Sequence, residues 1–331
     1  MVDRTSSTVS VGDRIAAIKK RLVVPAFQAP MFLVSGPELV IAACKAGVVG
    51  SFPTMNARPI EILESWFEQI TAELKEAEKG SPGKVAPWAA NLIVHRSFER
   101  FEKDLALVQK YKPDIVITAL GSPRRVIKQV HDYGGLVFAD VNSVAYAKKA
   151  AEAGADGLVL VSSGAGGHTG FVTGFSFLPA VRSFFDGPII LGGGIVDGQG
   201  IRAAEVLGAD FAYLGTRFIP TNESMASDKY KQMLVDSTEE DIFITAHFTG
   251  VPANYLRPSI ENAGLNPDNL GVREEKRFDS RAKNSSESEE PKAWRDIFSA
   301  GQGLRTINTV QSVAALVSDL KKGYDAAKPK P

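Results

Sequence analysis

The sequence has little of three features that mark whole classes of protein: cysteine, charge of one sign and long apolar runs. Cys44 is the one cysteine among 331 residues, so no disulfide can form within the chain. We expect a reducing compartment, and we interpret Cys44 as a buried core thiol because it lies in an apolar helical run. Disulfide-rich secreted folds are therefore excluded.

The lack of net charge and the lack of long apolar runs both narrow the class of binding partner. Basic and acidic residues number 38 each, which leaves no net field to attract nucleic acid or an anionic membrane surface. No apolar run approaches the roughly 18 to 20 residues that span a bilayer. We expect a soluble, cytoplasmic protein with a small-molecule partner, and the sequence leaves a homodimer open.

Some chemical signatures are absent as well. No spacing of His, Cys, Asp and Glu suggests a metal site, and neither a nucleophile elbow nor a Walker loop occurs. Chemistry at a bound organic cofactor remains open.

What is present is a regular alternation of apolar runs and helical patterns from Val23 to Thr216. Eight strands separated by helices give the count of a (β/α)8 TIM barrel. The strands are expected at 23–30, 48–52, 85–94, 114–120, 136–141, 157–163, 188–194 and 210–216. The helices are expected at 38–47, 59–79, 98–111, 122–134, 143–154, 177–187, 198–208 and 308–323, with Trp66 and Phe67 in the core.

An internal repeat supports this pattern. A helix end, a Gly-Ala-Asp turn and an apolar strand occur at 150–164 and again at 203–216. An open doubly wound sheet is the alternative fold. It would place its glycine fingerprint after the first strand, whereas the glycine clusters here follow the sixth, seventh and eighth strands.

The chain divides into three parts by composition. Residues 1–216 form the predicted cofactor-binding barrel. Residues 217–300 are expected to form a C-terminal lid or second subdomain, and residues 301–331 a turn and helix that pack back on the barrel. Within the second part, 274–291 is polar and poor in apolar residues, which predicts a solvated loop.

Glycine turns at the ends of three consecutive strands predict an anion site. Gly166 and Gly167 follow the sixth strand, Gly193 and Gly194 the seventh, and Gly215 with Thr216 the eighth. In barrels of this kind the loops after the last strands often bind phosphate through backbone N–H groups. The alternative is that these glycines only form tight turns.

His168 directly follows the first of these turns. A histidine among glycines at the carboxyl end of a strand is well placed for general acid-base chemistry, although a structural role is the alternative. The other histidines are weaker candidates: His95 ends the third strand, His131 lies on a helix and His247 in the expected lid.

At these motifs the sequence resembles the nitronate monooxygenase family, formerly 2-nitropropane dioxygenases, which are FMN-dependent TIM barrels. The resemblance covers most of the chain. Its motifs are QAPM at 28–31, NL at 91–92, SSGAGGHTG at 162–170, GGGIVDGQG at 192–200, GADFAYLGTRF at 208–218 and AGQG at 300–303.

The resemblance implies oxidation of alkyl nitronates, and of nitroalkanes if they are accepted, by O2 to a carbonyl compound and nitrite. His168 would be the catalytic base. FMN would be held by the backbone at Pro30 and Met31 and by Asn91 near its isoalloxazine ring, with Asp140 and Gln302 as further contacts. Its phosphate would be held by Gly166, Gly167, Gly193, Gly194, Gly215 and Thr216.

The sequence departs from the family pattern after the fifth strand. Family members often carry lysine in that loop, where this chain reads ADVNS with Asp140. A carboxylate in place of a cation changes the redox tuning of a flavin. Two other functions stay open: a flavin-dependent enoyl-acyl carrier protein reductase that uses NAD(P)H, and a non-catalytic flavin-binding protein.

Overall fold

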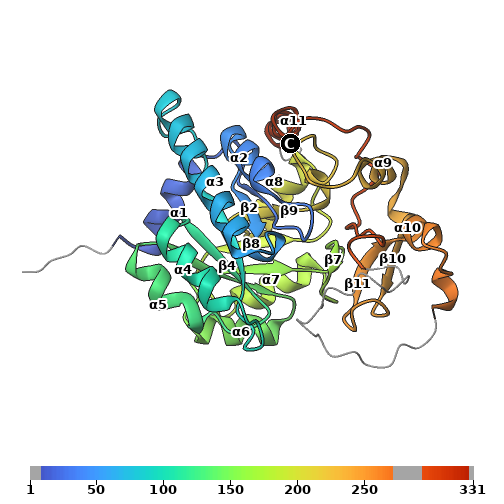
Figure 1. The fold of residues 1–331 in the computed structure, drawn as a ribbon, viewed down its shortest axis with the longest axis horizontal. Coiled ribbons are helices and arrows are strands. Elements are labelled where there is room, and N and C mark those ends of the chain that lie inside the picture. The colour runs from blue at the N-terminus through green and yellow to red at the C-terminus, as the bar shows by residue number, and fades with distance from the viewer. Residues whose placement is uncertain (1–8, 271–292, 328–331) are drawn as a thin grey trace, which may run out of the picture.

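The computed structural model describes residues 9–270 and 293–327 (Figure 1). The solvated loop predicted at 274–291 lies outside the described residues. Among the described residues no helix is both long and apolar enough to cross a membrane.

Eight parallel strands form the predicted barrel. They pair in the order β1-β9-β8-β6-β5-β4-β3-β2. The barrel closes between its two end strands, where the Gln28 N–H donates to the Val49 carbonyl at 2.8 Å and the Val49 N–H to the Ala26 carbonyl at 3.1 Å. This closure excludes the open doubly wound sheet. The strands are β1 (Ala26–Gln28), β2 (Gly50–Pro53), β3 (Trp88–Ile93), β4 (Ile115–Ala119), β5 (Leu136–Val141), β6 (Gly157–Val161), β8 (Ile189–Gly192) and β9 (Phe211–Leu214).

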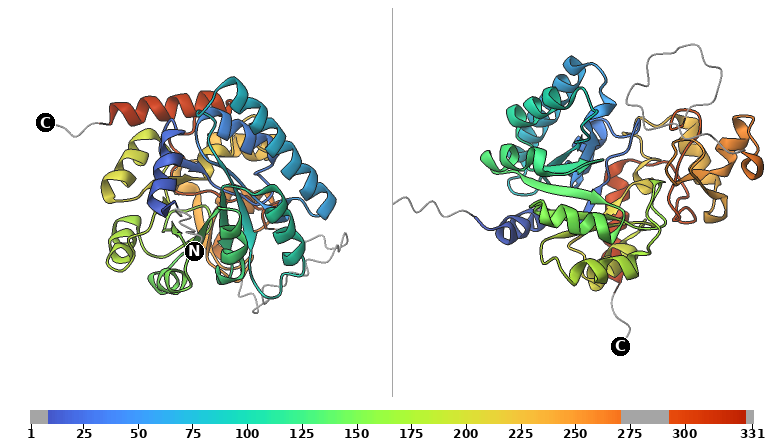
Figure 2. Two further views of the ribbon diagram at one scale, coloured as in Figure 1. Left: turned by 90° about the vertical axis from the view of Figure 1, so that its left-hand side faces the viewer. Right: turned by 90° about the horizontal axis from the view of Figure 1, so that it is seen from below.

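Helices surround this barrel, as the two views of Figure 2 show. The helix predicted at 177–187 was misplaced: α7 begins at Gly174 and ends at Arg182, because its N-cap is Thr173. Phe67 is buried in the core as predicted, and the half-buried Trp66 packs against the same cluster. The outer helices are α2 (Pro37–Ala46), α3 (Ile60–Gly80), α4 (Phe101–Tyr111), α5 (Arg124–Asp132), α6 (Val144–Glu152), α7 (Gly174–Arg182), α8 (Gly198–Leu207) and α11 (Val313–Ala326).

The barrel interior is packed with side chains. Phe27, Phe138 and Phe211 belong to one buried cluster in which the inward positions of the strands meet. Helix α1 (Val11–Lys20) adds Ile15 and Ile18 to the same cluster. Helix α1 covers the amino-terminal ends of the strands. The end of the barrel that remains open to a ligand is therefore the mouth at the carboxyl-terminal ends of the strands.

The two Gly-Ala-Asp turns of the internal repeat have the same structure. The Asp156 carboxylate accepts the Val137 N–H at 2.7 Å, and the Asp210 carboxylate accepts the Ile189 N–H at 3.0 Å. Each aspartate thereby ties its turn to the neighbouring strand. The repeat is thus one βα unit used twice, as the sequence predicts.

We call residues 217–300 the appended segment. It contains α9 (Asp228–Asp236), β10 (Ile242–Thr245), β11 (Ala253–Leu256) and α10 (Arg257–Asn262), with the 3-10 turns η3 (Glu239–Asp241) and η4 (Pro267–Asn269). Strand β11 pairs with β10 and also with β7 (Gly167–His168). Figures 1 and 2 show the segment beside the barrel on the side of β7. The segment is therefore joined to the loop that carries the predicted base.

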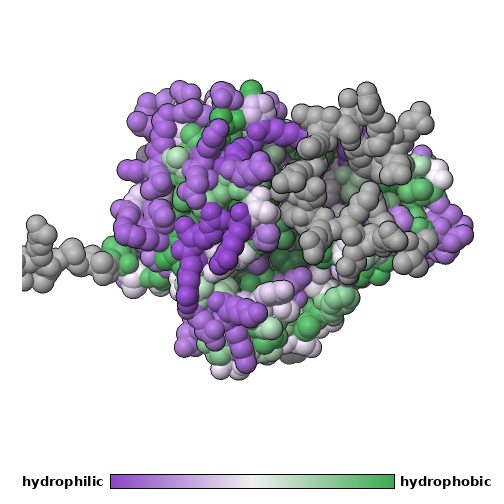
Figure 3. Space-filling view, turned by 60° about the horizontal axis from the view of Figure 1, so that its bottom comes forward, coloured by the Kyte–Doolittle hydropathy of each residue, from purple (hydrophilic) through white to green (hydrophobic). Residues whose placement is uncertain are grey.

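The surface is mixed in character. Figure 3 shows hydrophilic residues gathered over the upper left of this face and hydrophobic residues in the hollow at its middle. Cys44 is fully buried, and burial raises the pKa of its thiol to about 12. The thiol is therefore an unreactive core group, as predicted.

Candidate functional site

Three polar side chains lie at the mouth of the barrel interior. Asn91 on β3, Asp140 on β5 and Tyr213 on β9 each lie two residues beyond an inward-facing core residue, so strand alternation directs them inward. Asn91 Nδ2 donates to the Ile117 carbonyl at 3.2 Å and lies 3.5 Å from Asp140 Oδ2. The structure thus brings together two of the predicted cofactor residues from different strands.

Two polar atoms of this group have no partner among the described residues. Asp140 Oδ1 and the Tyr213 hydroxyl are both buried without a hydrogen bond. Burial raises the pKa of Asp140 to about 7, and burial together with Asp140 raises the pKa of Tyr213 well above its usual value. A buried acceptor and a buried donor at the barrel mouth suit the polar edge of a bound ring system.

The turn after β1 is held by its own hydrogen bonds. The Gln28 amide accepts the Ser51 N–H at 2.8 Å and donates to Ser35 Oγ at 3.0 Å. The Met31 N–H donates to Ser35 Oγ at 3.0 Å, and its carbonyl accepts from Asn56 Nδ2 at 2.9 Å. Both main-chain groups of Met31 are therefore engaged within the chain, and Pro30 has no N–H to offer.

The Met31 side chain meets another predicted residue. A Cβ placed on Gly215, directly after β9, would lie 3.5 Å from Met31 Sδ. The turns after the first and last barrel strands are therefore adjacent, as the closed barrel requires.

The glycine turn after β8 has one packed and one open position. A Cβ on Gly193 would meet Ser162 Oγ at 2.1 Å, so this turn lies against the end of β6. Gly194, at φ +69°, is exposed, and a Cβ added there would meet no atom of the described residues within 4 Å. Gly194 thus leaves space on its Cβ side through which a ligand could approach the backbone of this turn.

The turn after β6 packs on the AGQG motif. A Cβ on Gly166 would lie 2.7 Å from the Gly301 nitrogen, so this glycine is required by the close approach of another backbone. The Gly301 N–H donates to Thr216 Oγ1 at 2.8 Å, and the Gln302 N–H to the Gly164 carbonyl at 2.9 Å. Gly166, Thr216 and Gln302 are thereby brought together from three separate parts of the chain.

His168 is held mainly by the appended segment. Its backbone pairs with Ala253 of β11, and its Nε2 lies 3.0 Å from Thr249 Oγ1. The Trp294 ring stands edge-on to the imidazole at 5.4 Å and also contacts the position of Gly167. Burial lowers the pKa of His168, so the ring is neutral near pH 7.

The remaining histidines have other surroundings. His95 is exposed two residues beyond β3, with Nδ1 2.7 Å from Ser97 Oγ. His131 Nε2 lies 2.8 Å from Asp156 on the outside of the barrel. The His247 ring packs edge-on against Phe248 in the appended segment. His168 is the histidine that the fold places beside the glycine turns.

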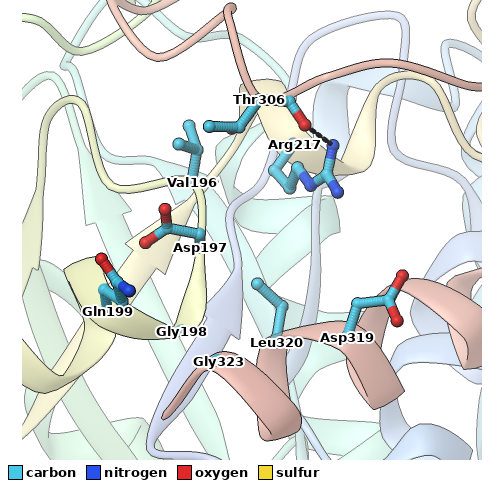
Figure 4. A pocket seen from close by; sticks show the side chains of 9 residues that line it. All are labelled: Val196, Asp197, Gly198, Gln199, Arg217, Thr306, Asp319, Leu320 and Gly323. Atoms are coloured by element: carbon cyan, nitrogen blue, oxygen red, sulfur yellow. Dashed lines mark hydrogen bonds between the residues drawn. The ribbon is translucent and has the colours of Figure 1, made fainter. Parts of the chain in front are cut away.

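A pocket of about 210 Å³ lies behind the turn after β8, between the start of α8 and α11 (Figure 4). Arg217 turns toward Thr306 and donates to its carbonyl at 3.1 Å, with Asp197 and Asp319 on either side. Neither His168 nor Asp140 lines this pocket.

Comparison with known proteins decides the family. A sequence model of the nitronate monooxygenase family matches residues 15–323. The chain belongs to the nitronate monooxygenase family. Membership makes it an enzyme of an oxidoreductase family and implies a flavin cofactor.

The named relatives of this family member include nitronate monooxygenases and a carboxyl-CoA dehydrogenase. The chain is 28% identical to a nitronate monooxygenase of Paraburkholderia phytofirmans, over 73% of this chain and 76% of that protein. It is 25% identical to a probable nitronate monooxygenase of Bacillus subtilis, over 91% and 96%. It is 29% identical to an octahydro-indene-carboxyl-CoA dehydrogenase of Rhodococcus jostii, over 72% of this chain. The match spans only 64% of that dehydrogenase.

Solved structures agree with the fold. Nitroalkane oxidase from Streptomyces ansochromogenes superposes with a TM-score of 0.74 at 23% identity, covering 94% of this chain and 99% of that one. FabK from Thermotoga maritima gives a TM-score of 0.72 at 24% identity, covering 94% and 96%. Both likenesses establish the barrel architecture alone.

Four residues of the site are not predicted as such by the sequence. Tyr213 lies within the matched GADFAYLGTRF motif, and Thr249 and Asn254 lie in FTGVPANYLRPSI, for which the sequence predicts only a place in the lid. The Asn254 amide donates to the Ala165 carbonyl at 2.7 Å and so holds the turn before His168. Trp294, the fourth, precedes the AGQG motif by six positions, and this proximity is its only signal in the sequence.

Proposed function

We propose that the protein oxidises alkyl nitronates with O2, using FMN, to a carbonyl compound and nitrite. The observation that carries the proposal is the family match over residues 15–323, on a chain whose neutral His168 stands beside the glycine turns. In the overall change the carbon of the C=N bond gains oxygen and the nitrogen leaves as nitrite. Cytoplasmic location and the lid role of 217–300 belong to the same proposal.

The residues at the barrel mouth suit FMN. The Asp140 Oδ1 and Tyr213 hydroxyl, both without partners among the described residues, would meet the polar edge of the ring beside Asn91. The Met31 side chain and Pro30 would contact the ring from the turn after β1, because the main chain of Met31 is already engaged. Bound FMN supplies a two-electron acceptor that O2 reoxidises.

The phosphate would lie at the last strand ends. Gly193, Gly194, Gly215 and Thr216, in the turns after β8 and β9, would face it, and Gly166, Gly167 and Gln302 would close the site from the turn after β6 and the AGQG motif. Backbone N–H groups there would bind the anion without a basic side chain.

His168 would act on the substrate. A neutral imidazole accepts a proton, so it would remove the proton from the carbon next to the nitro group of a neutral nitroalkane. A nitronate is already deprotonated, and its anionic oxygens would then only be oriented by the ring. Exclusion of water around the partly buried ring strengthens these contacts.

Nitrite release by the purified yellow protein tests the proposal. His168→Asn should lower kcat/KM for a neutral nitroalkane about 100-fold or more, since general-base catalysis contributes at least this much. His95→Asn, at an exposed histidine two residues beyond β3, is the matched control and should leave the rate unchanged. Unchanged turnover in His168→Asn would remove the assigned base, and a protein whose bound-cofactor mass is not that of FMN would refute the cofactor.

A further inference from the structure

The hydrogen bonds of Thr249 bear on which nitrogen of His168 carries a proton. Thr249 lies in the turn between β10 and β11, 81 residues from His168 in sequence. Its Oγ1 is 3.0 Å from His168 Nε2, and it donates to the Val251 carbonyl at 3.1 Å. The Val251 N–H also points to Thr249 Oγ1, at 3.4 Å. The buried Tyr255 hydroxyl also lies near Thr249.

A hydroxyl has one proton to donate and two lone pairs to accept with. Thr249 Oγ1 has the geometry to donate to the Val251 carbonyl, and with its proton there its lone pairs face the Val251 N–H and His168 Nε2. A lone pair that faces Nε2 can only accept. With the threonine proton on the Val251 carbonyl, Nε2 is the protonated nitrogen of the neutral ring, which leaves Nδ1 unprotonated.

The ring also has a fixed position. Its backbone is paired with Ala253, and the Trp294 ring packs edge-on against it at 81°. Trp294 adopts a left-handed backbone conformation at φ +70°, which is uncommon for a bulky residue and is held by its surroundings. Among the described residues Nδ1 has no hydrogen-bond partner, so it is available to a substrate.

We propose that Thr249 is a positioning residue that fixes the Nε2–H tautomer of His168, so that Nδ1 is the atom that takes the proton from the substrate. The inference rests on the proposed role of His168 as a base. In that step the C–H bond next to the nitro group breaks, the proton bonds to Nδ1, and the electron pair stays on the substrate as a nitronate. No oxidant is needed for the transfer itself.

The opposite arrangement would leave the ring without a free base. If Thr249 donated its proton to Nε2, the proton of the neutral ring would lie on Nδ1, and the only unprotonated nitrogen would already be occupied by the threonine. The two tautomers are distinguished by nitrogen chemical shifts, which do not depend on catalysis.

The test is ¹⁵N–¹H NMR of the holoenzyme labelled at histidine, with His168 assigned by comparison with His168→Asn. The wild type should show a protonated Nε2 and an unprotonated Nδ1. Thr249→Ser should keep this pattern because it keeps the hydroxyl. Thr249→Val should shift His168 toward a mixture of tautomers and lower kcat/KM for a neutral nitroalkane about three- to ten-fold, the range expected for one lost hydrogen bond.

Thr245→Val is the control for the loss of a hydroxyl in the same hairpin, since Thr245 Oγ1 accepts from the His247 N–H rather than from His168. It should leave the His168 signals unchanged. A wild-type ring protonated at Nδ1, or a pattern in Thr249→Val identical to the wild type, overturns the inference. If the tautomer is as stated but no nitro compound is consumed, the proposed function fails while the assignment of Thr249 stands.

Discussion

Asn91 Nδ2 and Asp140 Oδ2 lie 3.5 Å apart at the mouth of the barrel, on strands that the chain separates by 49 residues. Asp140 Oδ1 has no partner among the described residues, and burial raises the pKa of this carboxyl to about 7. The carboxyl is therefore neutral in the folded protein over a range in which it is ionised in the unfolded chain. Its ionisation is linked to stability.

Asp140→Asn should flatten the dependence of stability on pH. The folded carboxyl holds its proton until about pH 7, whereas the unfolded one loses it near 3.8, so the wild type loses stability as pH rises through this window. Between about pH 5 and about pH 8 the loss should be on the order of 2–3 kcal/mol. Urea unfolding of the flavin-free protein at the two pH values measures it. A wild type equally stable at both would contradict the assignment.

Thr216→Val should loosen the AGQG turn. The variant removes the acceptor of the Gly301 N–H, and a buried donor left without a partner costs about 1–3 kcal/mol of unfolding free energy. Thr216→Ser keeps the oxygen and should recover most of the loss. Urea unfolding of both variants gives the comparison, and equal stabilities would mean that the 2.8 Å bond contributes nothing.

Gly166→Ala should destabilise the fold whether or not a cofactor is bound. The added Cβ would lie 2.7 Å from the Gly301 nitrogen and 2.9 Å from the Ala300 carbonyl carbon, and neither is a side chain that can rotate away. Overpacking of this kind costs about 1–3 kcal/mol. Gly80→Ala, at the end of α3, is the control: the added Cβ would meet no atom of the described residues within 4 Å, and the variant should be neutral or slightly stabilising. Thermal unfolding should show a lowered Tm for Gly166→Ala alone.

The barrel could be predicted from the sequence because the signals for its strands and helices are local. Each strand is a short apolar run and each helix a periodic pattern, and the glycine turns follow the last strands, so a closed barrel could be predicted without knowledge of the Phe27–Val49 pairing. The turns at Asp156 and Asp210 could be recognised as copies of one unit for the same reason, because each copy of the repeat is a run of consecutive residues.

The contacts around His168 could not be inferred in this way. Strand β7 has only two residues, too few for any periodicity, and its pairing with β11 joins segments far apart in the chain. The contact with Thr249 follows from that pairing. Likewise, the reason for Gly166 lies in the approach of Gly301, which no local pattern reveals.

Stopped-flow absorbance of the yellow holoenzyme under anaerobic conditions tests the central claim most directly. The protein is mixed with propionate 3-nitronate in one experiment and with NADPH in another, and bleaching of the flavin is followed. A nitronate monooxygenase should bleach with the nitronate and remain oxidised with NADPH. Rapid bleaching by NADPH alone, with no response to the nitronate, would contradict the account and favour an enoyl reductase.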